Sequence, residues 1–129
     1  MNRYSARIEK INPDVEGEVL LSINGKNLLC FIYFSLPKEA REGEVYEVEL
    51  KPMVFDDCLV EELQENSASG VSRIGRSFGY EIKGRLKGGA IDVEGVEFED
   101  EVLSSEFSYL DGRMVSWRVD RIDAEFIQN

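Results

Sequence analysis

The sequence of 129 residues contains no histidine and only two cysteines. Without histidine the chain lacks Ser-His-Asp and Cys-His nucleophile systems, histidine metal sites and the usual general base near neutral pH. Cys30 and Cys58 do not form a C-x-x-C motif, which excludes the common kinds of zinc site. We therefore expect no catalytic residue set, no bound metal and no cofactor.

Long apolar runs are also missing. No run approaches the roughly 20 residues that a membrane-spanning helix needs. The first 14 residues, MNRYSARIEKINPD, have no apolar core of the kind found in secretory signals. The sequence thus predicts a cytoplasmic protein whose thiols are reduced.

Basic charge is scarce. The chain has 15 lysines and arginines against 26 acidic residues, which gives a net charge of -11. Nucleic-acid phosphates and anionic lipid surfaces repel such a chain, so we expect it to bind neither directly. A basic protein is the partner that this charge favours, with an attraction that salt screens. The sequence does not indicate an oligomeric state.

Alternation of apolar and polar residues with a period of two is abundant and predicts β-strands. It covers residues 3–11, 15–23, 26–34, 44–51, 78–86, 90–98 and 113–122. Asn24-Gly25 is the strongest short signal for a hairpin turn. Short strands at regular spacing predict an all-β, mainly antiparallel small barrel or sandwich over one domain, residues 1–129.

Two segments depart from this alternation. Residues 57–65 predict one short helix, which Asp56 or Asp57 caps and which carries an apolar stripe. Residues 66–77 are rich in serine and glycine and predict a flexible loop. Strands, one helix and further strands over residues 3–98 form a pattern that is similar to an OB-fold barrel with additions. That resemblance implies no ligand by itself.

The stretch GVSRIGRS, residues 70–77, resembles the phosphate-binding pattern G-x-x-x-x-G-K-[ST]. A P-loop lies between a strand and a helix, whereas here the expected strand follows the stretch, and an arginine replaces the lysine. We expect Asp92 and Glu94 to face Arg85 and Lys83 across a hairpin with a Gly88-Gly89 turn. Three basic residues remain as a candidate anion- or ligand-binding set: Arg73, Arg76 and Lys87.

A partner surface is the other candidate site. The Asn24-Gly25 turn places Glu18 opposite Phe31 and Glu16 opposite Tyr33, so that carboxylates face aromatic rings. The acidic stretch 92–101 adds a second group of carboxylates. The predicted partner surface consists of Glu16, Glu18, Phe31, Tyr33, Glu97, Glu99 and Asp100.

Two functions remain open from the sequence. The first is a non-catalytic protein-binding or adaptor module, including an inhibitor or immunity-type protein that covers the cationic site of a basic partner. The alternative is a barrel that binds an anion or another small ligand through Arg73 and Arg76, with or without enzymatic activity. The absence of a recognisable catalytic set favours the first.

Overall fold

The computed structural model describes residues 3–127, and the chain forms two compact units. Unit 1 contains the residues up to 51 together with those from 122 onward, and unit 2 contains residues 52–121. The chain therefore completes most of unit 1, builds unit 2, and then returns to unit 1. The single domain predicted over residues 1–129 stays a prediction.

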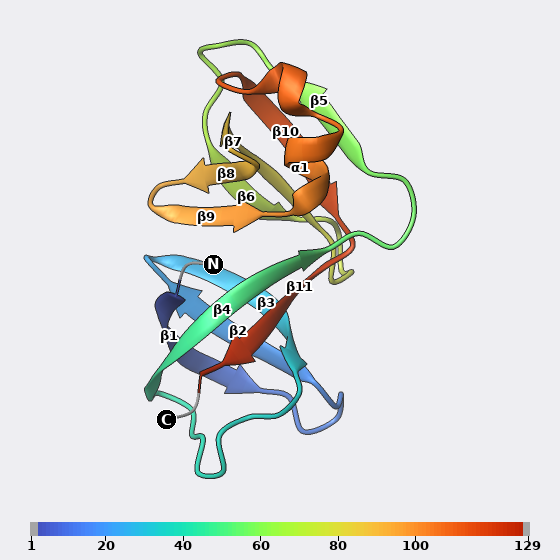
Figure 1. Ribbon diagram of the computed structural model, residues 1–129. Coiled ribbons are helices and arrows are strands. Elements are labelled where there is room, and N and C mark those ends of the chain that lie inside the picture. Colours follow the sequence, from blue (N-terminus) through green and yellow to red (C-terminus); the bar gives the residue numbers. More distant parts are fainter. Residues whose placement is uncertain (1–2, 128–129) are drawn as a thin grey trace. The chain divides into compact units, whose positions relative to one another are not determined.

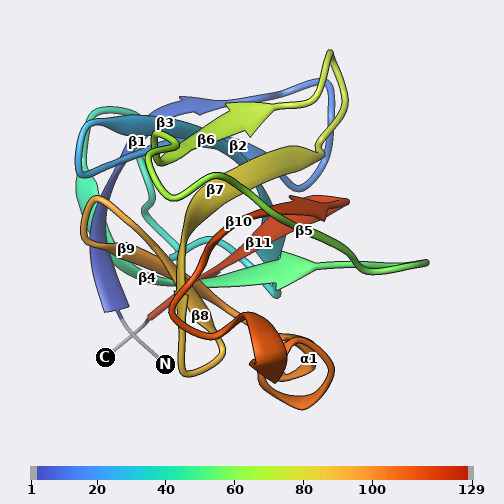
Figure 2. The ribbon, with the colours of Figure 1, turned by 90° about the horizontal axis from the view of Figure 1, so that it is seen from above.

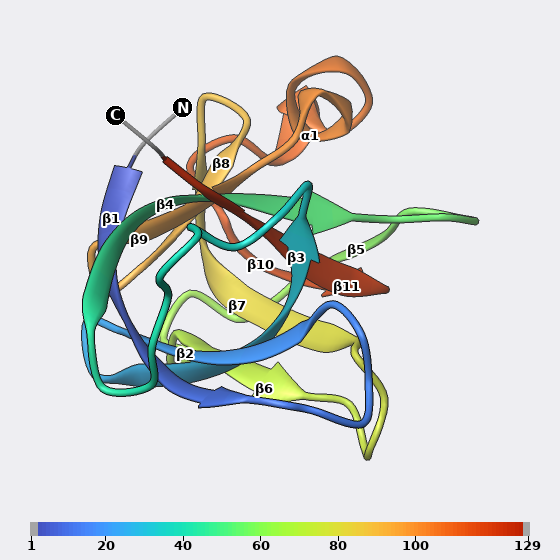
Figure 3. The same cartoon turned by 90° about the horizontal axis from the view of Figure 1, so that it is seen from below.

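Unit 1 is a closed five-stranded barrel (Figure 1), which confirms the predicted all-β, mainly antiparallel class. Its strands are β1 (Arg3–Ile11), β2 (Glu18–Ile23), β3 (Lys26–Tyr33), β4 (Val45–Met53) and β11 (Arg121–Phe126). Around the barrel they follow the order β1-β2-β3-β11-β4, and β11 runs parallel to β3. Figure 3 shows the same barrel from below, with the curvature of β1 and β4.

The β2–β3 hairpin has the predicted register. Val19 pairs with Cys30 and Leu21 with Leu28, and all four side chains are buried. Asn24 and Gly25 both have positive φ, 49° and 77°, as a type I′ turn requires. The inward side chains of this hairpin meet those of the other strands, and Ala6, Ile8, Val48, Ile122 and Ala124 complete the barrel core.

Unit 2 is built on a six-stranded sheet, seen from above in Figure 2. Its strands are β5 (Leu59–Glu62), β6 (Gly70–Arg73), β7 (Tyr80–Lys87), β8 (Ala90–Val93), β9 (Val96–Glu99) and β10 (Met114–Val119). The order is β5-β10-β7-β8-β9, and β6 pairs with β7. Its core contains the large, fully buried side chains of Ile82, Leu86, Ile91, Phe98, Leu103 and Trp117.

The helix of the structure is α1 (Glu101–Ser105), followed by a 3-10 turn, η1 (Ser108–Leu110). The Asp100 side chain caps α1, because its Oδ1 accepts a hydrogen bond from Val102 N at 2.9 Å. The helix packs against the β7–β8 turn, where a β-carbon added to Gly89 would lie 3.1 Å from Cβ of Ser104.

The helix predicted near 57–65 is wrong. Residues 59–62 form strand β5, in which Val60 pairs with Trp117 of β10. An isolated helix as short as residues 57–65 is only marginally stable in water. Pairing with the buried strand β10 therefore favours the extended conformation of residues 59–62. Within the predicted loop 66–77, residues 70–73 form β6; the flexibility of that segment stays a prediction.

The hairpin after β7 confirms the pairing of Arg85 with Asp92. The expected pairing of Lys83 with Glu94 is wrong, because Glu94 and Gly95 form the tight β8–β9 turn with positive φ. That turn accounts for the change in alternation between Val93 and Val96, which pair with each other. The closed barrel also uses residues 3–53 and 121–126, not the continuous range 3–98 expected for an OB-like pattern.

Candidate functional site: an acidic and aromatic groove

A groove of about 650 Å³ lies on unit 1, lined by residues 11–12, 16–18, 31–32 and 34–36. The loop between β1 and β2 supplies one side, and the end of β3 with the residues after it supplies the other. We call this hollow the groove. Its lining combines aromatic and aliphatic side chains with two carboxylates, and no lysine or arginine contributes to it.

Phe31 and Gly17 form the floor of the groove. A β-carbon added to Gly17 would lie 2.6 Å from Cε1 of Phe31, so the ring occupies the place that any other residue would need. Gly17 also has a φ of +88°, which L side chains rarely adopt. Its carbonyl oxygen accepts a hydrogen bond from Ile32 N at 2.6 Å, which extends the hairpin under the groove.

Phe34 forms an exposed wall of the groove. Its side chain is 84% exposed, and its φ of +71° is an uncommon, strained value for a bulky residue. The ring meets that of Tyr33 edge to face, with centroids 4.4 Å apart. Tyr33 in turn lies beneath Lys51, whose Nζ is 4.2 Å from the ring centroid.

An ion pair holds Lys51 in that place. Lys51 Nζ lies 3.0 Å from Oε1 of Glu125, on β11. The hydrogen bond to Glu125 raises the pKa of Lys51 above its ordinary value, although partial desolvation opposes the shift. A chain of contacts from Glu125 through Lys51 and Tyr33 thus supports the exposed ring of Phe34.

The two carboxylates of the groove differ in their surroundings. Glu16 is exposed, whereas Glu18 is half-buried and accepts a hydrogen bond from Asn12 Nδ2 at 2.5 Å. Asn12 Oδ1 accepts another from Asp14 N at 2.9 Å, so this amide orders the β1–β2 loop and orients Glu18. The groove therefore offers negative charge next to an apolar surface.

The structure brings together only part of the predicted partner surface. Glu16, Glu18 and Phe31 line the groove, and Tyr33 flanks it through Phe34. The remaining three residues belong to unit 2, where Glu97 and Glu99 lie on β9 and Asp100 caps α1. Their part in a partner surface stays a prediction.

Of the three predicted anion-binding residues, Arg73 and Arg76 share one turn and Lys87 lies apart from them. The guanidinium of Arg73 donates hydrogen bonds to the carbonyl oxygens of Ser77 and Arg76, at 2.7 and 2.8 Å, and so braces its own turn. Arg73 pairs with Tyr80 at one end of β7, while Lys87 ends that strand. At about 3.3 Å per residue the two ends are roughly 23 Å apart. Ligand binding by Arg73 and Arg76 stays a prediction.

Both thiols have raised pKa values. Burial raises the pKa of the Cys30 thiol far above its usual range, with a smaller contribution from Asp123. Desolvation raises that of Cys58, the Trp117 side chain lowers it, and Asp100 and Glu106 raise it further. Within residues 3–127, no group of three or more histidine, cysteine or acidic side chains is placed to hold a metal ion.

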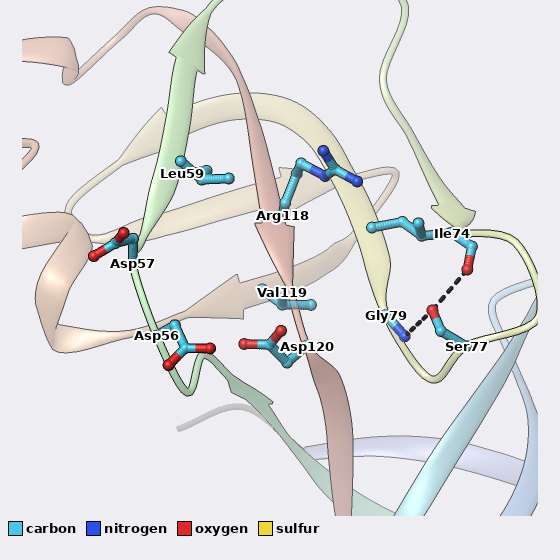
Figure 4. Close-up of a pocket in the computed structure, with 9 residues that line it drawn as sticks. All are labelled: Asp56, Asp57, Leu59, Ile74, Ser77, Gly79, Arg118, Val119 and Asp120. Carbon is cyan, nitrogen blue, oxygen red and sulfur yellow. Dashed lines mark hydrogen bonds between the residues drawn. The ribbon is translucent and has the colours of Figure 1, made fainter.

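A second hollow, of about 450 Å³, lies on unit 2 (Figure 4). Asp56 and Asp57 before β5, and Asp120 after β10, contribute carboxylates to it. Arg118 contributes a guanidinium, and Figure 4 shows this group turned away from the three carboxylates. Apolar residues Leu59, Ile74 and Val119 also line the hollow.

Sequence patterns missed the most exposed part of the groove and the second hollow. Phe34 ends an unbroken apolar run that suggests a covered strand, and nothing in the sequence signals its positive φ. The end of that run before Ser35 and Pro37 is the one local sign of exposure. Arg118 and Asp120 belong to an alternating strand pattern that does not mark them as site residues. They line a hollow only because the loop 55–57 lies beside them.

No helix in the described part of the chain is long and apolar enough to cross a membrane. No curated protein and no solved structure matches the chain significantly. A family model described as uncharacterised conserved protein UCP019853 matches residues 1–127, almost the whole sequence. The chain therefore belongs to this family of uncharacterised conserved proteins.

Proposed function

We propose that the protein is a non-catalytic binding module of the cytoplasm whose groove receives a basic segment of another protein. The observation that carries the proposal is Phe34, a large apolar side chain that is 84% exposed and held at a strained φ of +71°. Strained backbone persists where the surrounding structure enforces it, and it is concentrated at functional sites. Aromatic side chains, phenylalanine among them, are enriched at protein interfaces.

The carboxylates give the partner its charge. Glu16 and Glu18 line the same groove as Phe34, so a lysine or arginine next to an apolar side chain matches it. The net charge of -11 attracts such a segment over longer distances and increases the rate of association. A partner that uses a cationic surface to bind nucleic acid has this chemistry, which makes an inhibitor or immunity-type role the sharper form of the proposal.

The barrel of unit 1 supports an OB-like assignment. It has five strands, closes fully, and joins its last strand in parallel to β3 after a long excursion of the chain. Barrels of this type use one face and the loops between strands to bind extended ligands. The groove occupies the β1–β2 loop and the segment that follows β3. We infer that this protein uses the same kind of location for a polypeptide.

Affinity capture with matched baits tests the proposal. The baits are the wild type, Phe34→Asn, which removes the exposed ring of the groove, and Tyr109→Asn, which removes a 73% exposed ring from unit 2. We expect a basic protein that the wild type and Tyr109→Asn retain and that Phe34→Asn loses. Its retention should fall as the salt concentration rises from 50 to about 300 mM, because screening shortens the range of the attraction.

Two results would contradict the proposal. One is a set of captured proteins that is the same for all three baits, since the groove would then play no part. The other is a Phe34-dependent partner that is acidic or whose binding does not respond to salt. A Glu16→Gln/Glu18→Gln variant separates the contribution of the carboxylates from that of the Phe34 ring. It should weaken the capture of the same partner while keeping the ring.

A further inference from the structure

We infer that the hollow on unit 2 binds a small zwitterion, an amino acid or a dipeptide, between Arg118 and a group of aspartates. This hollow, called the dipolar hollow below, is separate from the groove and has a different chemistry. A cation lies on one side of it and carboxylates on the other, and apolar side chains complete its lining (Figure 4).

Arg118 is the cationic side of the dipolar hollow. It lies on β10, where it pairs with Leu59 of β5 and with Glu81 of β7. The carboxylate of Glu81 is engaged by Lys83 Nζ at 3.4 Å and by the Ser116 hydroxyl at 3.1 Å. Among residues 3–127, no side chain forms an ion pair with Arg118, and its planar fork is free to bind a ligand carboxylate through two parallel hydrogen bonds.

The aspartates are the anionic side. Asp120 Oδ2 accepts a hydrogen bond from Phe55 N at 2.7 Å, which ties the loop before β5 to the end of β10. This bond places Asp56 beside Asp120, as Figure 4 shows. The carboxylates of Asp56 and Asp57 have no hydrogen bond or ion pair within the described residues. An ammonium group needs acceptors of this kind, and it can donate three hydrogen bonds to them.

The opposite charges do not neutralise each other. No ion pair within 4.0 Å joins Arg118 to any of the three aspartates, and Figure 4 shows its guanidinium turned away from them. A ligand that carries both charges can bridge this gap and cover the apolar surface with its body. A purely anionic or purely cationic ligand would engage only one of the two charged sides of the hollow.

The size of the hollow agrees with a small ligand. Its volume of about 450 Å³ is at the lower end of the range of roughly 300–1,000 Å³ that is usual for small-molecule sites. A dipeptide separates its two charges farther than an α-amino acid does, so we compare both kinds of ligand. The apolar lining favours a leucine-like side chain.

Calorimetric titration of the whole chain with four compounds tests the inference: glycyl-leucine, free leucine, N-acetylglycyl-leucine and glycyl-leucinamide. We expect glycyl-leucine to bind, and each blocked derivative to bind at least tenfold more weakly. A charged hydrogen bond is worth about 1.5–3 kcal/mol, which corresponds to a factor of roughly ten to one hundred. If free leucine binds more tightly than glycyl-leucine, the site is assigned to amino acids.

Variants locate the binding. Arg118→Gln and Asp56→Asn should each weaken glycyl-leucine binding at least tenfold, because each removes one of the two counter-charges. Arg76→Gln is the matched control, since it removes an exposed arginine of unit 2 that does not line the hollow. Thermal unfolding of each variant shows whether it is folded, and Arg118→Lys should recover part of the binding by restoring the charge.

Three outcomes would overturn the inference. The first is no binding of glycyl-leucine or leucine at millimolar concentration. The second is equal binding of glycyl-leucine and glycyl-leucinamide, because the aspartates alone would then be the site. The third is binding that Arg118→Gln and Arg76→Gln affect equally. None of these outcomes bears on the groove of unit 1, which the capture experiment with Phe34→Asn tests separately.

Discussion

The ring of Phe31 lies over the α-carbon of Gly17, where a β-carbon would be only 2.6 Å from Cε1. This contact joins the β1–β2 loop to β3 and forms the floor of the groove. Although Phe31 is partly exposed, its ring is therefore packed against the backbone of the β1–β2 loop. The absence of a side chain at Gly17, which precedes β2, leaves room for the ring.

Replacement of Gly17 by alanine tests this contact. Gly17→Ala should reduce the free energy of unfolding by about 2–4 kcal/mol, because a positive φ costs roughly 1–2 kcal/mol and displacement of the ring costs roughly as much again. Gly43→Ala is the matched control, since Gly43 has a φ of +89° and no atom within 4 Å of its β-carbon position. Urea unfolding measures both. Equal losses for the two variants would show that Phe31 yields without cost.

Strain at Phe34 predicts an order of stability among its variants. Phe34→Asn and Phe34→Val both remove the exposed ring, but asparagine tolerates a positive φ and a β-branched residue does not. We expect Phe34→Asn to be more stable than Phe34→Val by about 1 kcal/mol or more in urea unfolding. A valine variant as stable as the asparagine variant would mean that the positive φ of Phe34 is not enforced by its neighbours.

The ion pair between Lys51 and Glu125 predicts a titration. Because the pair raises the pKa of Lys51, the folded protein holds this proton more tightly than the unfolded chain does. Its stabilisation is fully present below the ordinary pKa of 10.5 and is lost as the pH rises through the higher value of the folded state. For this surface pair we expect about 0.2–1 kcal/mol.

Carbon-13 NMR of the lysine side chains measures this shift directly. Glu125→Gln should return the pKa of Lys51 toward 10.5, because the hydrogen bond to Glu125 is the largest cause of the shift. Glu49→Gln, which removes a more weakly acting carboxylate, should change it less. A Lys51 titration that Glu125→Gln leaves unchanged would contradict the ion pair.

The two thiols should differ in reactivity. Cys30 is fully buried and should not react with iodoacetamide in the folded protein, whereas Cys58 is partly accessible and should react slowly. The rate at Cys58 should rise with pH to a midpoint above 9.0, since its pKa is raised mainly by desolvation. Folding should become less favourable above pH 9.0, because the unfolded thiol loses its proton first.

Mass spectrometry of the labelled protein measures the rate at each cysteine. Glu106→Gln should lower the midpoint for Cys58, because it removes a negative charge that disfavours the thiolate, and Glu65→Gln is a control that does not contribute. Labelling of Cys30 at the same rate as Cys58 would show that unit 1 opens in the native state. A midpoint at or below 9.0 would contradict the desolvation of Cys58.

The strands of unit 1 followed from local chemistry. The Asn24-Gly25 turn between two apolar segments determined the β2–β3 register, including the placement of Glu18 opposite Phe31. Side chains alternate across a strand and a type I′ turn fixes which residues face each other, so both features are encoded within a few residues. The part of the groove that Glu18 and Phe31 form was therefore predictable from the sequence.

Residues 57–65 show where local chemistry was insufficient. Leu59 and Val60 fit a helical stripe as well as a short strand, and pairing with β10, more than fifty residues later, selects the strand. The same long-range pairing places Asp56 and Asp120 at one hollow. Short segments have weak preferences of their own, and contacts made by distant residues override them.

The sequence by itself determined the all-β class, the acidic charge and the lack of histidine chemistry, because composition and alternation are properties of the chain. Only the tertiary structure decided that β11 returns to complete the barrel beside β3. It alone revealed the exposed, strained Phe34 and an Arg118 without an ion pair among residues 3–127, because the partners of a charge depend on segments that are distant in sequence. The dipolar hollow arises from such long-range placement, because residues 56–59 and 118–120 meet there.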